Sequence, residues 1–267
     1  MFDGDPYQML AGTAGNKKWV SATAVADYGD AQALLRSPGA AFEVGAVRLI
    51  NRSGSTATMG LGVRYGVTTW VAGQVTSVGA YTDTTTAAQD ATTGDFTLWQ
   101  LAITTGNGFL VGATSRFNTL GFVQSVAGDQ TTPVLKLEYW NGAAWVDITT
   151  ALLISQALSA GGTGEKVLVW GAPADWALGG SGTSVPQTTY NVRVTHTVAA
   201  AGAANPLASQ LFVGWSQLVF PAVADQGVGS FVYPYPVRFP RAGTSLFPLF
   251  SVAAFANQAE IQYRLCL

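Results

Sequence analysis

The sequence predicts an all-β protein, built as an antiparallel β-sandwich or jelly roll. Segments in which apolar and polar residues alternate recur roughly every 8–12 residues, which is the strand spacing typical of such folds. The turns between these segments are rich in glycine, which occurs 31 times in the chain. One decorated jelly roll and two tandem sandwiches both fit this pattern.

Six segments in the first half have strand patterns. They are Glu43–Ile50, Ala57–Tyr65, Thr69–Val75, Phe96–Ile103, Phe109–Val111 and Leu120–Val126. The turn-forming residues Asn51–Gly54 are expected to join the first two strands. The polar segment 82–94 is expected to be a loop or a domain boundary.

The clearest hairpin covers residues 134–148. Its first strand alternates apolar and polar residues, and Asn141-Gly142 separates that strand from a second one at Trp145–Ile148. Asn-Gly tolerates the positive φ angles of a type I′ turn, and it is the strongest short-range hairpin signal. The sequence therefore predicts a type I′ hairpin here.

Four further strands are predicted in the second half, at Lys166–Trp170, Tyr190–Val198, Leu211–Val219 and Ala259–Leu265. Proline lacks the N–H that a β-ladder needs, so the run Pro234-Tyr235-Pro236 reduces residues 231–250 to an edge strand or an extended chain. We expect this segment to lie across a neighbouring subunit, with Tyr235 as a contact residue.

Helical patterns are weak. Asp30–Arg36 is expected to form two helical turns that begin at an Asp30 cap and stop before Ser37-Pro38. Thr149–Leu158 fits either a short helix or a loop.

The expected organisation is an irregular N-terminal arm at 1–40, a β-sandwich domain at 41–125 and a second one at 126–267. The arm contains aromatic residues but little strand pattern, so we expect Tyr7 and Trp19 to contact a partner subunit. Strand pairing across residues 80–95 would decide between one domain and two.

The composition indicates a protein that works inside an assembly. Charged residues make up 10% of the chain, against roughly a quarter in ordinary soluble domains. Hydrophobic residues make up 48%, with 8 tryptophans, which excludes a disordered chain. Because charged residues are depleted where subunits meet, we expect neighbours to cover much of the surface and the chain to form homo-oligomers.

Other classes of protein are disfavoured. No stretch approaches the roughly 18 apolar residues of a membrane-spanning helix. The net charge of −2 and the lack of a basic stripe argue against nucleic-acid binding. Cys266 is the single cysteine, so no internal disulfide is possible. The first ten residues lack the basic and apolar regions of a signal peptide, so we expect synthesis and assembly in the cytoplasm.

Three blocks in the second half form an ordered set. They are Leu137–Trp145 with the pattern YWNG-x-x-W, Val167–Trp176 with an apolar strand closed by P-x-D-W, and Tyr190–Val194 with the pattern Y-x-V-R-V. This set of roughly 60 residues resembles a β-sandwich module that recurs in structural proteins of tailed bacteriophages. The Asn51–Gly54 turn, between apolar strands, also resembles head and tail proteins of such phages.

The resemblance implies a structural virion component, with no catalytic residues to carry over. Because the chain is compact and lacks coiled-coil heptads, we expect a capsid decoration (cement) protein that binds the major capsid protein or other virion subunits. The alternative is a tail, baseplate or fibre-associated protein whose lectin-like sandwich binds host glycans. Either reading implies a virion protein assembled in the host cytoplasm.

Four tryptophans near these blocks are candidate contacts with a partner or a glycan. They are Trp140, Trp145, Trp170 and Trp176. Aromatic faces suit carbohydrate rings, but large aromatics also fill cores and interfaces, and strand alternation turns some of these side chains inward. We expect a core or subunit-interface role rather than a lectin site.

No catalytic, cofactor or metal site is expected. His196, the single histidine, shares strand parity with Val192 and Val194, so we predict a packed core residue rather than a catalytic base or a pH-sensitive interface. The segments Gly161–Gly164 and Gly179–Gly182 lack the following Lys-Ser/Thr of a phosphate-binding loop and are expected to be plain loops.

Three carboxylates near the tryptophans are candidates for the two catalytic groups of a sugar-cleaving enzyme. Glycosidases need two carboxylates across a cleft, and Glu138, Asp147 and Asp175 are the available ones. Glu138 shares a strand face with Lys136 and is expected to be solvated, while Asp175 is expected to tie a turn before Trp176. Structural roles are therefore favoured, and no enzymatic activity is expected.

Overall fold

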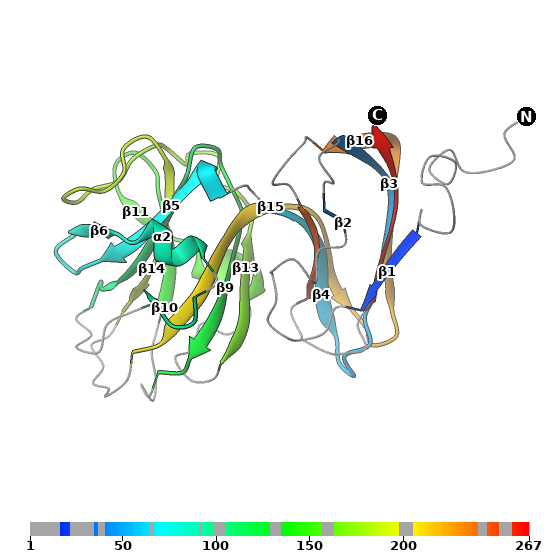
Figure 1. Ribbon diagram of the computed structural model, residues 1–267, viewed down its shortest axis with the longest axis horizontal. Coiled ribbons are helices and arrows are strands. Elements are labelled where there is room, and N and C mark those ends of the chain that lie inside the picture. Colours follow the sequence, from blue (N-terminus) through cyan, green and yellow to red (C-terminus); the bar gives the residue numbers. More distant parts are fainter. Residues whose placement is uncertain are drawn as a thin grey trace, which may run out of the picture. The chain divides into compact units, whose positions relative to one another are not determined.

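The computed structural model confirms the all-β prediction. It describes residues 17–21, 35–36, 41–64, 67–90, 92–98, 105–128, 135–155, 163–197, 205–239, 245–250 and 258–266. In these ranges the chain forms antiparallel sheets, with one short α-helix and two 3₁₀ turns. No helix within these ranges is long and apolar enough to span a membrane. The chain divides into two compact units, one of residues 67–214 and one of residues 1–66 and 215–267 (Figure 1).

Residues 67–214 form a sandwich of two sheets. One sheet has the order β11-β10-β14-β8-β5-β6, and the other runs β12-β13-β9-β15 within this unit. The strands are β5 (Trp70–Val75), β6 (Tyr81–Asp83), β7 (Phe96–Thr97), β8 (Gly108–Ala113), β9 (Thr119–Val126), β10 (Leu135–Trp140), β11 (Trp145–Asp147), β12 (Leu152–Ser155), β13 (Gly164–Trp170), β14 (Tyr190–His196) and the start of β15 (Leu207–Val223). The helical elements are η1 (Val67–Thr69), α2 (Thr85–Gln89) and η2 (Thr149–Ala151).

The strand order in this unit is of the jelly-roll type. Successive strands β8, β9 and β10 alternate between the two sheets, and β14 later inserts between β8 and β10. In the other sheet β9 lies between β13 and β15. Such returns of a late strand to lie beside early ones are the mark of Greek-key connections.

The core of the sandwich lies between its two sheets. Phe109 of β8 meets the rings of Phe96 and Phe122 edge-on, with centroids 5.9 Å apart in both pairs. Because Phe122 belongs to β9, this contact crosses from one sheet to the other. Val194 pairs with Phe109 on the same inner face, and His196, two residues further along β14, is fully buried. The predicted core position of His196 is confirmed.

The other unit contains a four-stranded sheet with the order β1-β18-β3-β16 and a run of strands β15-β4-β17-β2. The strands are β1 (Lys17–Ser21), β2 (Leu35–Arg36), β3 (Ala41–Ile50), β4 (Ala57–Arg64), β16 (Val228–Phe239), β17 (Ser245–Phe250) and β18 (Gln258–Cys266). Strand β15 belongs to both units: up to Gly214 it pairs with β9, and from Trp215 it continues into this unit.

The proline-rich strand β16 lies at the edge of its sheet, as predicted. Its ladder with β3 shifts between the pairs Val232↔Ala46 and Val237↔Val44, so residues 233–236 face only Gly45. Pro234 and Pro236 both lie in this irregular stretch of β16, between the paired positions, so the ladder with β3 does not need the N–H groups that they lack. Strand β17 differs from the expectation, because it pairs with β4 throughout and also with β2 at Ser245 and Leu246.

The units divide the chain differently from the expected domains. Strand β5 pairs with β8 across the 80–95 segment, and β13 pairs with β9 across the expected boundary at 125/126. Residues 67–214 are therefore one unit, inserted into the other rather than following it in tandem. Within the expected arm at 1–40 the described residues are those of β1 and β2, both strands and not irregular chain. The rest of that arm, including Tyr7, lies outside the described residues.

Several local expectations need correction. Leu35 and Arg36 pair with β17 as a strand, whereas the remainder of the expected helix at 30–36 lies outside the described residues. Segment 82–94 contains the short helix α2, and 149–158 begins with η2 and continues as β12. The expected strand at 96–103 is β7 alone as far as the structure describes it, with 99–103 outside the described residues.

The hairpin at 134–148 is present, but its turn is not type I′. Strands β10 and β11 pair through Trp140↔Trp145, which leaves the four-residue loop Asn141–Ala144. Only Gly142 in this loop has a positive φ, of 96°, whereas a type I′ turn needs two such residues. Asn141 contributes its side chain instead: Oδ1 accepts hydrogen bonds from the backbone N–H groups of Ala143 and Ala144, at 3.0 and 2.8 Å.

Candidate functional site on the outer face of the six-stranded sheet

Several of the side chains that the sequence singles out, among them Glu138, Trp140, Trp145 and Asp147, lie on the six-stranded sheet. We call the side of this sheet that faces away from β9 and β13 the outer face. Strand register places one row across it, from Leu110 through Arg193 and Glu138 to Asp147. Trp140 and Trp145 form the neighbouring pair on the same face.

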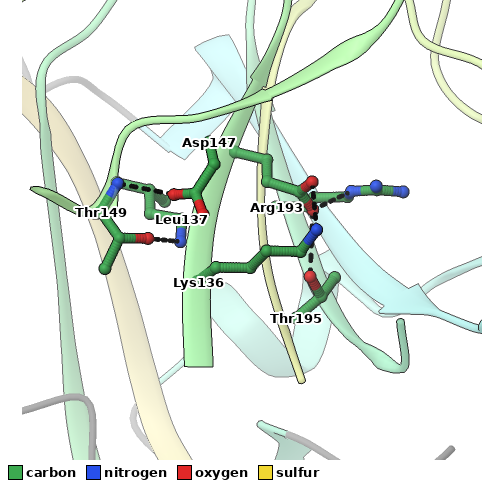
Figure 2. Close-up of polar contacts among 7 residues, drawn as sticks. Lys136, Leu137, Asp147, Thr149, Arg193 and Thr195 are labelled. Carbon is green, nitrogen blue, oxygen red and sulfur yellow. Dashed lines mark hydrogen bonds and ion pairs between the residues drawn. The ribbon is translucent and has the colours of Figure 1, made fainter. Parts of the chain in front are cut away.

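Glu138 is the centre of an ionic network on this face. Its carboxylate accepts from Lys136 Nζ at 2.6 Å, Arg193 Nε at 2.7 Å and Thr195 Oγ1 at 3.0 Å. Figure 2 shows Lys136, Arg193 and Thr195 converging from two adjacent strands. The Glu138 side chain is only 4% exposed, so the expectation of a solvated face is wrong, although Lys136 does share that face.

The network keeps Glu138 ionised. Burial alone would raise the pKa of Glu138, but hydrogen bonds and charge from Arg193 and Lys136 outweigh it and hold the pKa below its usual value. A general acid that protonates a glycosidic oxygen needs the opposite, a raised pKa. The arrangement therefore suits an internal ionic tie better than acid catalysis.

Trp145 covers the network from β11. The Arg193 guanidinium lies 4.4 Å from the centre of a Trp145 ring, a cation–π contact. Trp140 packs edge-on against Trp145 with centroids 5.5 Å apart. Trp145 is partly buried, with Arg193 over one face of its ring and Trp140 packed edge-on against it.

Residues 179–189, which we call the strap, cross the outer face. Val185 of the strap packs with Val75 and Leu110 of the sheet, and Tyr81 and Trp145 border this small apolar cluster. A backbone hydrogen bond also joins the strap to β6, because Tyr81 N–H donates to the Thr183 carbonyl at 3.0 Å. The strap thus covers the apolar part of the outer face, at Val75 and Leu110.

Asn191 anchors the two ends of the strap. Its side-chain Nδ2 donates to the carbonyls of Gly179 and Pro186 at 2.8 and 2.7 Å, and its Oδ1 accepts from Thr189 Oγ1 at 2.7 Å. The side chain is fully buried, and Gly112 opposite leaves space for it, because a Cβ there would lie 2.0 Å from Asn191 Oδ1. The strap, which includes Gly179–Gly182, is therefore a structural loop.

Trp176 is the centre of an aromatic cluster on the inner side. Its rings lie between 5.1 and 6.3 Å from those of Phe117, Tyr139, Trp170 and Tyr190. Trp176 is 1% exposed and Trp170 is 0% exposed, so both are core residues without surface for a partner or a glycan. Trp140, at 9% exposed, is also buried.

The two remaining acidic candidates both make local structural bonds. Asp147 Oδ1 accepts from the backbone N–H of Thr149 at 2.8 Å, and Thr149 Oγ1 in turn accepts from Leu137 N–H at 2.8 Å (Figure 2). Asp175 lies in the turn before Trp176 and accepts from the Tyr139 hydroxyl at 2.8 Å. These bonds tie the ends of β11 and the P-x-D-W turn to β10.

Other predicted contacts lie elsewhere in the chain. Trp19 is in β1 opposite Glu260, and Tyr235 is in the looped part of β16, while the side chains of both are outside the described part. Within the described ranges, no three histidine, cysteine, aspartate or glutamate side chains gather as a metal site would require.

Sequence reasoning missed the roles of two arginines. Arg193 completes the network around Glu138, and Arg116 donates to the carbonyls of Ala174 and Trp176 at 3.1 and 2.8 Å. The alternation in Tyr190–His196 does put Arg193 on the outer face, but its partner is defined only once the β10–β14 pairing is known.

Comparison with models of known protein families finds no match, and comparison with curated proteins finds none either.

Proposed function

We propose that this chain is a structural subunit of a tailed-phage virion. Our specific proposal is a capsid decoration (cement) protein that binds the major capsid protein or other virion subunits as a homo-oligomer. The main supporting observation concerns the side-chain contacts of the three blocks that resemble the phage module, at 137–145, 167–176 and 190–194. Their aromatic and ionic side chains bind one another, through Trp176, the Glu138 network and the Asp175–Tyr139 bond, as in a framework rather than an active site.

The exposed surface gives further support. The tip of the strap, 181–184, exposes only serine, glycine and threonine. Several large apolar side chains are also exposed on separate elements: Val78, Val126, Leu153, Leu178, Val228 and Phe231. Surfaces poor in charge and partly apolar are typical of the centres of subunit interfaces.

The lectin-like alternative would need an accessible aromatic face. Trp145 is the most accessible of the four tryptophans, but Arg193 lies over its ring and Trp140 packs at its side. A sugar that stacked on this face of Trp145 would compete with Arg193, which is also bound to Glu138. This favours the decoration role over the tail or fibre role.

The proposal is tested on purified particles. We expect many copies of the chain per virion by quantitative mass spectrometry, and density for the 67–214 sandwich repeated over the capsid in a particle reconstruction. A few copies at the tail would support the alternative in place of decoration. Absence of the chain from purified virions would refute both.

A matched pair of variants links the fold to particle binding. Particles made without the chain are mixed with Trp176→Ala, which removes the centre of the aromatic cluster, or with Ser115→Ala, which changes an exposed polar side chain. We expect Ser115→Ala to bind like the wild type and Trp176→Ala to fail. Equal binding of both variants would show that particle binding does not need the intact aromatic cluster around Trp176.

A further inference from the structure

The chain contains the dipeptide Asn-Gly twice, in two different environments. Asn141-Gly142 forms the tip of the β10–β11 hairpin, and Asn107-Gly108 leads into β8. Both belong to the unit 67–214. Because the following glycine has no side chain, its backbone nitrogen can approach the asparagine amide without steric hindrance.

At Asn141 the turn presents the side-chain amide to the following backbone. Oδ1 accepts from the N–H groups of Ala143 and Ala144, at 3.0 and 2.8 Å, which folds the side chain over the turn. Gly142, Ala143 and Ala144 are exposed, so water reaches the site. Around Gly142, the only contact within 4 Å of an added Cβ would be the Ala177 Cβ, at 3.3 Å.

At Asn107 the same dipeptide is held in the sandwich. Asn107 is 7% exposed, its Oδ1 accepts from Ser77 N–H at 2.7 Å, and its carbonyl accepts from His196 N–H at 3.0 Å. Gly108 pairs with Thr195 on one side and Val75 on the other. The backbone there is fixed by ladder bonds on both sides.

We propose that Asn141 is a self-modification site that deamidates in the folded protein, whereas Asn107 does not. The Gly142 nitrogen loses its proton to solvent base and bonds to Cγ of Asn141. The Cγ–Nδ2 bond then breaks, and the amide nitrogen leaves as ammonia. Water opens the resulting succinimide at either carbonyl, which gives aspartate or isoaspartate.

The turn geometry favours the first of these steps. Negative charge develops on Oδ1 as the Gly142 nitrogen attacks, and the N–H groups of Ala143 and Ala144 already point at that atom. Preorganised backbone donors of this kind stabilise an oxyanion more than solvent does. The product carries a new negative charge at the hairpin tip, in a chain with only 15 acidic residues. This inference does not depend on the proposed function.

The test uses the wild-type chain with both sites read in the same sample. Trypsin cleavage after Arg64 and Arg116 releases a peptide containing Asn107, and cleavage after Lys136 and Lys166 releases one containing Asn141. The folded chain is incubated in mildly alkaline buffer, and mass spectrometry follows the replacement of the amide by a carboxyl group in each peptide. A second sample is incubated in urea.

We expect Asn141 to convert at least about tenfold faster than Asn107 in the folded chain, because Asn107 must wait for local opening and each 1.4 kcal/mol of opening costs about tenfold. In urea the two sites should convert at similar rates. A smaller difference in the folded chain would overturn the proposal. An equally large difference in urea would also overturn it, since the neighbouring sequence and not the fold would then be the cause.

Discussion

At the scale of single residues, the buried imidazole of His196 makes stability depend on pH. Burial lowers the pKa of His196 from 6.5 to about 4, so the folded state takes up this proton only well below neutral pH. The unfolded chain takes it up near 6.5. The contribution of His196 to the free energy of unfolding is therefore constant above that pH and falls as the pH drops toward 4, by about 3 kcal/mol in total.

Urea unfolding at a series of pH values measures this loss. His196→Gln is the control, because it removes the titrating group and should flatten the curve between pH 6.5 and 4. The lowered pKa of Glu138 acts mainly at lower pH, since its stabilisation is lost as the pH falls through and below the usual value of 4.5, which overlaps the His196 range only at its acid end. Equal slopes for the wild type and His196→Gln would contradict the prediction.

At the scale of elements, Asn51 joins two turns that are far apart in the sequence. Its Nδ2 donates to the carbonyls of Ser55 and Val223, at 2.7 and 2.8 Å, and its Oδ1 accepts from Ser53 N–H at 3.0 Å. Its backbone also bonds Gln226 and Gly227. The side chain is fully buried, so these bonds tie the β3–β4 turn to the β15–β16 turn.

Asn51→Ala should destabilise the protein by about 3 kcal/mol, because it removes three hydrogen bonds of a fully buried side chain and leaves their partly buried backbone partners unpaired. Thermal or urea unfolding measures the change. Asp225→Ala is the matched control: it removes another side-chain bond between these turns, from Gly54 N–H at 3.0 Å, at an exposed position where water replaces the carboxylate. A loss for Asn51→Ala no larger than that for Asp225→Ala would refute the role given to Asn51.

Strands with a clear alternation of apolar and polar residues could be predicted from the sequence. Features that depend on contacts between residues far apart in the chain could not. Alternation located β3, β4, β9, β13 and β14 within a few residues. It could not show that Glu138 is buried, because that depends on Arg193 and Lys136 covering it. Likewise, Asn141-Gly142 marked the hairpin, but the side-chain hydrogen bonds of Asn141 selected a different turn.

At the scale of the whole molecule, the insertion of residues 67–214 between 66 and 215 was beyond sequence reasoning. The polar 82–94 segment has the composition of a linker, yet it carries α2, where Ala88 is fully buried, and it lies in the sequence between β5 and β8, which pair with each other in one sheet. The true divisions fall at Gly66 and within the continuous strand β15, where no change of composition marks them.

The low charge of the whole chain leads to a prediction about how the proposed decoration protein would be held in a particle. The 267 residues include only 13 basic and 15 acidic ones, and Lys136 and Arg193 are already bound to Glu138, so ionic contacts can supply only a small part of a broad interface. Raising salt from about 0.1 M to about 1 M shortens the screening length from about 10 Å to about 3 Å, which weakens contacts between exposed charges and leaves apolar ones intact. We therefore expect particles sedimented from 1 M NaCl to retain the chain at the same copy number as those from 0.1 M. Release of the chain in high salt, while the shell stays intact, would show that ionic contacts hold it and would contradict the charge-poor interface proposed here.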